Sequence, residues 1–106
     1  MTHSAEITLP NDSGAEECVW VEPWGNYVTV PPGAALRVVG QSPQPGAFEA
    51  DRRGPEVVVY AWPGATVRCF VGADEVSHPE FRIPAPVLPP GVSTSRFLRF
   101  VLGRNP

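Results

Sequence analysis

Short alternations of apolar and polar residues, each ended by a turn signal, run through most of the chain. β-branched and aromatic residues dominate these stretches, and Pro, Gly or Asn follow them, which is typical of β-strands and argues against long helices. Strands this short, joined by tight turns, predict an antiparallel sheet with sequential neighbours paired. The expected strands span residues 5–9, 18–22, 27–30, 35–40, 56–62 and 66–71.

Two similar passages contain all three tryptophans: Val-Trp-Val-Glu-Pro-Trp-Gly at 19–25 and Val-Val-Tyr-Ala-Trp-Pro-Gly at 58–64. Each passage ends in a turn made of Trp, Pro and Gly, so each marks the end of a strand. Because another apolar run follows the second turn at once, we predict a hairpin between residues 56–62 and 66–71. Trp62, at the turn of this hairpin, is expected to be structural. Trp24 is the tryptophan to test first for binding, and the alternative is that it too plugs the end of a small core.

The second arm of that hairpin alternates, so its two faces can be assigned. The more polar face is expected to point away from the core, and the more apolar face toward it. The first set is Thr66, Arg68 and Phe70, and the second is Val67, Cys69 and Val71.

The pattern changes in the last third of the chain. Residues 73–91 are rich in proline and are expected to be extended. Residues 92–104 predict a short C-terminal helix with Gly103 at its C-cap. We therefore predict one all-β domain over residues 1–106. It is an antiparallel β-sandwich of six to eight short strands, with a strand-rich core at 15–72 and the C-terminal helix beside it.

Composition narrows the class of protein. Lysine is absent, so all eight basic residues are arginines, a bias that a GC-rich genome produces and that indicates a bacterial source. The net charge of −3 argues against a general nucleic-acid binder, because such proteins carry a basic surface. The acids of residues 1–36 have no arginine among them, and the arginines of residues 81–106 have no acid. The two ends are expected to face each other, or the basic end to face a partner.

The two cysteines, Cys18 and Cys69, both lie in apolar runs. No basic and apolar leader precedes them, so a cytoplasmic location with reduced, packed thiols is expected. Apolar stretches are interrupted well short of the ~20 residues that span a bilayer, so no membrane partner is expected. Nucleotide-binding, zinc and lipidation motifs are absent, and we expect no cofactor.

One loop carries candidate chemistry. Residues 74–80 contain three carboxylates and an imidazole, and Asp74, His78 and Glu80 are the candidate ligands for a divalent metal. An acid–base pair in this loop would make the chain a small metal-dependent or hydrolytic enzyme. A solvated connection is the favoured interpretation, because only one histidine lies in the body of the chain.

Aromatic residues and arginines favour binding instead. Turn aromatics on sandwiches stack on sugars or on peptide side chains, and arginines beside aromatics on the C-terminal helix suit an acidic protein surface. The favoured alternative for that helix is docking on its own domain, with its arginines at the helix C-terminus or paired with Glu16, Glu17 or Glu22. We predict a non-catalytic binding module whose partner is another protein or a second copy, with carbohydrate binding as a further alternative. The candidate binding residues are Trp24, Tyr27, Arg96, Arg99 and Phe100.

One segment is similar to a known scaffold. Tyr27-Val-Thr-Val-Pro-Pro-Gly33 followed by Leu36-Arg-Val-Val39 resembles the strand, Pro-Gly turn and strand of cupredoxin-like sandwiches, over about a dozen residues. The copper site of that family needs two His, a Cys and usually a Met. Here Cys69 and His78 have no second His or Met after them. The resemblance therefore implies the scaffold without the copper site.

Overall fold

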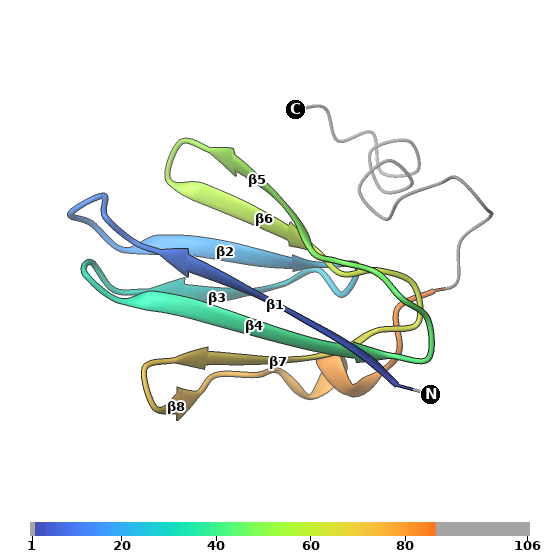
Figure 1. Cartoon of the computed structure of the whole chain (residues 1–106). Coiled ribbons are helices and arrows are strands. Elements are labelled where there is room, and N and C mark those ends of the chain that lie inside the picture. Colours follow the sequence, from blue (N-terminus) through green and yellow to red (C-terminus); the bar gives the residue numbers. More distant parts are fainter. Residues whose placement is uncertain (1, 87–106) are drawn as a thin grey trace.

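Two four-stranded sheets packed face to face make up the computed structural model, which describes residues 2–86 (Figure 1). One sheet has the strand order β1-β4-β7-β8, and the other has the order β3-β2-β6-β5. The predicted all-β sandwich is confirmed. Within residues 2–86 the only helical element is the 3-10 turn η1 (Pro79–Arg82), and the helix predicted at 92–104 lies outside the described residues.

Each of the six predicted strands forms, with small changes at its ends. Residues 49–53 also form a strand of their own, and a two-residue strand follows the Gly72 turn. The strands are β1 (His3–Pro10), β2 (Glu17–Glu22), β3 (Asn26–Val30), β4 (Ala35–Ser42), β5 (Glu49–Arg53), β6 (Glu56–Tyr60), β7 (Thr66–Val71) and β8 (Asp74–Glu75).

The predicted hairpin of residues 56–62 with 66–71 is wrong. β7 pairs with β4, placing Val38 opposite Cys69, whereas β6 lies parallel to β2 in the other sheet. The chain crosses from one sheet to the other between Tyr60 and Thr66, and Trp62 is buried at the crossing. The β2–β6 pair is also the one parallel exception among the described strand pairs, which are otherwise antiparallel as predicted.

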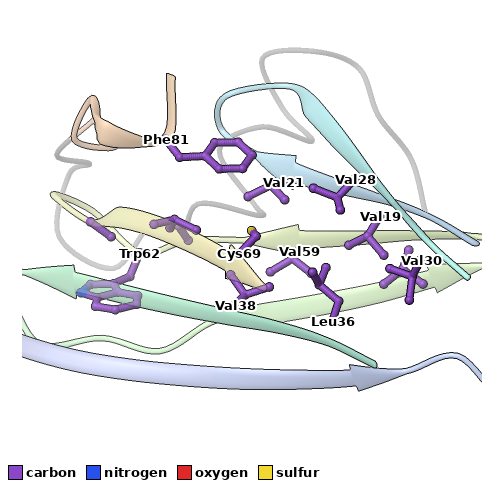
Figure 2. Packing of buried hydrophobic residues seen from close by; sticks show 14 residues of the cluster. Val19, Val21, Val28, Val30, Leu36, Val38, Val59, Trp62, Cys69 and Phe81 are labelled. Atoms are coloured by element: carbon purple, nitrogen blue, oxygen red, sulfur yellow. The ribbon is translucent and has the colours of Figure 1, made fainter. Parts of the chain in front are cut away.

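Valine dominates the space between the sheets. β-branched residues suit strands, and burial of each one contributes about 1.5–3 kcal/mol to folding. Cys69 lies on the core face of β7, as predicted, and is fully buried. Figure 2 shows the labelled members of this cluster, which are Val19, Val21, Val28, Val30, Leu36, Val38, Val59, Trp62, Cys69 and Phe81.

Trp62 fixes the position of the crossing. Its indole packs edge-on against Phe48, with ring centroids 5.2 Å apart and an interplanar angle of 82°. The indole Nε1 donates a hydrogen bond of 2.8 Å to the carbonyl oxygen of Gln44. Gly40 and Gly46 leave room for the ring, because a Cβ at either position would overlap it. The structural role predicted for Trp62 is confirmed.

We predict that Gly40→Ala destabilises the protein by about 1–3 kcal/mol, because overpacking a filled core forces neighbours to shift. A Cβ at residue 40 would lie 2.7 Å from Cζ3 of Trp62 and 2.8 Å from Cζ of Phe48. Urea unfolding measures the change. The control is Gln41→Ala on the exposed face of β4, which should alter stability by less than about 0.5 kcal/mol. Equal unfolding midpoints for Gly40→Ala and the wild type would contradict this packing.

Candidate functional site

Phe70 lies on the outer face of the β1-β4-β7-β8 sheet, between two guanidinium groups. β7 alternates, so Arg68 and Phe70 face outward as predicted. Arg37 reaches Phe70 from β4, where the strand register pairs the two residues. The Cζ atoms of Arg37 and Arg68 lie 4.8 Å and 5.0 Å from the ring centroid. Cation–π contacts at exposed sites contribute about 0.5–1 kcal/mol each, so they hold the ring and both charges in one surface.

Carboxylates orient both guanidinium groups. Arg37 Nη1 lies 3.4 Å from Oε1 of Glu6 on β1. Arg68 binds Glu75 with two hydrogen bonds, of 2.7 Å from Nη2 to Oε1 and 3.3 Å from Nε to Oε2. The hydroxyl of Ser77 donates a further bond of 2.8 Å to Glu75 Oε2. The Arg68–Glu75 pair is therefore the more firmly oriented of the two, since it has fork geometry and a third partner.

Two shallow pockets lie side by side on the outer face of the β1-β4-β7-β8 sheet, and both are lined by Thr66 and Arg68. One of about 330 Å³ lies between Arg68, Ser77 and Arg82. A second of about 240 Å³ lies over Val39, between Arg37 and Arg68. Arg82 makes no ion pair with another residue of the described part of the chain. We call the surface formed by Arg37, Arg68, Phe70 and Arg82 the arginine face.

Hydrogen bonds shift the titration of the ion pair on this face. Bonds from Arg68, and then from Ser77, lower the pKa of Glu75 from 4.5 to about 2. The bond to Glu75 correspondingly raises the pKa of Arg68. Both groups are therefore charged throughout the physiological range, and the arginine face keeps its pattern of charge there.

Trp24, one of the predicted binding residues, anchors the end of the sandwich. Its side chain is partly buried and packs on the core. The indole Nε1 donates a hydrogen bond of 2.8 Å to the carbonyl oxygen of Ile83, and the ring lies 5.4 Å from that of Phe81. Trp24 thus holds the segment after β8 against the β2–β3 turn.

Tyr27, the second predicted binding residue, is 50% exposed on the opposite sheet. Its ring lies 5.1 Å from that of Trp20 and is tilted by 54° to it. The register of β2 and β3 pairs these two residues, so they share the outer face of the sheet. The predicted residues Arg96, Arg99 and Phe100 lie outside the described residues.

The acidic loop at 74–80 does not gather its carboxylates around His78. Asp74 is exposed on β8, and Glu75 is held by Arg68. The Nε2 of His78 lies 2.9 Å from the carbonyl oxygen of Tyr27, and its ring packs on Phe81. Among residues 2–86, no group of three or more His, Cys, Asp or Glu side chains is placed to hold a metal ion.

The two cysteines are free thiols in different environments. Burial, and to a smaller degree Glu75, raises the pKa of Cys69 to about 12. Burial, followed by the charges of Glu56 and Glu16, also raises the pKa of Cys18. Raised pKa values leave little thiolate, so neither cysteine has the environment of an activated nucleophile.

The arginine face was only half predicted. The alternation in β7 places Arg68 and Phe70 on one surface, and that signal is local to the strand. Arg37 joins them only because β4 pairs with β7, which the predicted hairpin did not include. The alternation of Leu36, Arg37 and Val38 in β4 indicates that Arg37 faces outward, but not that it lies beside Phe70.

Comparison with known proteins adds no relative. No protein-family model, curated protein or solved structure matches the chain. Within residues 2–86, no helix combines the length and the apolar character needed to cross a membrane.

We predict that Glu75→Gln destabilises the protein above pH 4.5, and that this difference shrinks as the pH falls toward 2. The lowered pKa of Glu75 means that its ion pair stabilises the fold above the unfolded-state pKa and is lost on acidification. Urea unfolding at several pH values measures the difference. Glu80→Gln, in the same exposed segment, is the control. A constant difference between pH 6 and pH 2 would contradict the prediction.

We predict that only Cys18 reacts with a thiol reagent in the folded protein at pH 8, and that it reacts more slowly than a free cysteine. A pKa of about 12 leaves Cys69 with a thiolate fraction of about one in ten thousand at that pH. Labelling Cys18→Ser and Cys69→Ser separately assigns the reaction. Rapid modification of Cys69 in native buffer would show that its burial is not maintained.

Proposed function

We propose that this chain is a small non-catalytic module that binds another protein through the arginine face. The observation that carries the proposal is Phe70, flanked by Arg37 and Arg68 on an outer sheet surface beside Arg82. Arginine and aromatic residues are enriched at protein interfaces and among the residues that dominate binding energy. The guanidinium groups are already oriented, which lowers the entropy cost of binding.

The partner that fits this surface is an acidic protein segment with apolar side chains. Arg82 forms no ion pair within residues 2–86, and the ring of Phe70 offers a flat apolar contact. The hollow over Val39 is of a size to receive one side chain. The net charge of −3 supports a protein rather than a nucleic acid as the partner.

The enzyme alternative has less support. A metal or acid–base site at 74–80 needs Asp74, His78 and Glu80 together, but His78 is engaged by Tyr27 and Phe81. Carbohydrate binding would use Tyr27, whose ring is half exposed. Its tilt against Trp20 breaks the flat platform on which a sugar ring stacks.

A bacterial source and a cytoplasmic location belong to the same proposal. The bias toward arginine supports the first. Two free cysteines, on different sheets, support the second, since reducing compartments keep thiols unpaired. Self-association is the remaining option for the partner, and the test below includes it.

The test is an NMR titration of the full chain with three decapeptides in which Leu alternates with Glu, Lys or Ser. We expect the Leu-Glu peptide alone to bind, and to shift the signals of Arg37, Arg68 and Phe70. Phe70→Ala should weaken binding about tenfold, the effect of losing about 1.4 kcal/mol. Tyr27→Ala, which removes an exposed aromatic from the other sheet, should not change it.

Equal binding of all three peptides, or shifts confined to the β3-β2-β6-β5 sheet, would contradict the proposal. Self-association is measured in the same samples by sedimentation at increasing protein concentration. A dimer that Phe70→Ala dissociates would replace the separate partner with a second copy of this chain.

A further inference from the structure

β1 forms one edge of the β1-β4-β7-β8 sheet and pairs with a described strand on one side only. All eight of its residues are in register with β4, from His3 opposite Ser42 to Pro10 opposite Ala35. On its other side, no strand within residues 2–86 lies beside it. A long edge of this kind presents backbone donors and acceptors to any chain that can extend the sheet.

Alternate residues of β1 direct their backbone groups away from β4. Asn11, which directly follows β1, donates its N–H to the carbonyl oxygen of the residue before β4, at 2.8 Å. In an antiparallel pair, residues bonded to the partner strand alternate with residues whose N–H and C=O point to the other side. The N–H groups of Ser4, Glu6 and Thr8 therefore point to the outer edge. Pro10 has the same phase, which suits it because proline has no N–H.

The side chains that β1 turns toward the core are only partly buried. Ala5, Ile7 and Leu9 pack against the core cluster but keep intermediate exposure. The edge strand β3 of the other sheet differs, since its core residues Val28 and Val30 are only 5% and 1% exposed. The apolar row of β1 thus still has surface to bury against a neighbour.

Two of the other sheet edges are protected against an added strand. β8 has only two residues, and β5 carries charged side chains at four of its five positions. Short strands and charged strands are common means of preventing edge-to-edge pairing. β1 has neither protection, because it is eight residues long and Glu6 is its only acidic or basic residue apart from His3.

The sequence of β1 is complementary to itself in an antiparallel arrangement. Residues directly opposite each other share a face of the sheet, so a two-fold axis must pass between two copies of one residue. An axis at Glu6 would oppose two carboxylates, which is unfavourable. An axis at Ile7 instead sets Ala5 opposite Leu9 on the core side. On the outer side, it sets Glu6 opposite the neutral Thr8.

We propose that two copies of this chain associate through antiparallel pairing of their β1 strands, with Ile7 at the two-fold axis. The two β1-β4-β7-β8 sheets then become one continuous sheet, joined by about six backbone hydrogen bonds from Ser4, Glu6 and Thr8 of each copy. The residues of the arginine face lie on β4, β7 and η1 rather than on β1. The dimer therefore stands or falls independently of the proposed function.

The first test follows the wild-type full chain at concentrations from about 10 μM to about 1 mM, where weak dimers dissociate. We expect sedimentation to show a monomer that becomes a dimer across this range. Amide hydrogen exchange at Ser4, Glu6 and Thr8 should slow about tenfold with it, whereas Ile7, bonded to β4, exchanges slowly throughout.

Two results of this experiment would overturn the proposal. One is a chain that stays monomeric at the highest concentration. The other is protection of Ser4, Glu6 and Thr8 that does not depend on concentration, because the edge of β1 would then be occupied within a single chain.

The second test removes one outward N–H from β1. Thr8→Pro deletes a donor to the second copy but none to β4, so the dimer Kd should rise at least about tenfold. Thr8→Ser keeps the N–H and is the matched control, with an expected change of less than about twofold. An unchanged Kd in Thr8→Pro would contradict the pairing.

Phe70→Ala separates this dimer from association through the arginine face, and it should leave the Kd unchanged. A dimer that Phe70→Ala dissociates and Thr8→Pro preserves would overturn the proposal. NOEs in a mixture of isotope-labelled and unlabelled wild-type protein need no substitution, so they decide the matter even where Thr8→Pro unfolds the domain. Contacts between Ile7 side chains of different copies are expected, and contacts between copies that do not involve β1 would overturn the proposal.

Discussion

The packing of Trp62 between the two sheets is the constraint on which both outer surfaces depend. The indole occupies space that Gly40 and Gly46 leave open, and it takes the chain from β6 in one sheet to β7 in the other. Because β7 then pairs with β4, Arg37 comes beside Phe70. Because β6 stays beside β2, Val58 and Tyr60 join Trp20 on the opposite surface. Trp62 is thus buried at the crossing between the two strands that complete the two faces.

Local pattern was enough to predict six of the eight described strands, but not which strands pair. The alternation of apolar and polar residues along 66–71 predicts both the strand β7 and the burial of Cys69, because each depends only on residues that are neighbours in the sequence. The Pro-Gly turn after Trp62 is the same signal in a hairpin and in a crossing between sheets, so the pairing of β6 and β7 could not be read from it. β5 has the sequence Glu-Ala-Asp-Arg-Arg, which is polar, as is common for a strand at the edge of a sheet. It therefore has no apolar alternation from which a strand could be predicted. The candidate site follows the same rule: Arg68 and Phe70 are evident from one strand, whereas Arg37 requires the nonlocal pairing.

The two outer surfaces differ in chemistry in a way that suits different contacts. The arginine face combines oriented guanidinium groups with a single aromatic ring and stays open. The surface that contains Trp20, Val58 and Tyr60 combines buried apolar residues with surrounding carboxylates.

The strand pairing around Trp62 is tested most directly by backbone NOEs in the uniformly labelled full chain. Contacts that pair Val38 with Cys69, together with contacts that pair Val19 with Val57 in parallel register, are the expected result. Contacts that pair β6 directly with β7 across the Pro63-Gly64 turn would contradict it. In that case Arg37 would no longer lie beside Phe70, and both surfaces would have to be reassigned.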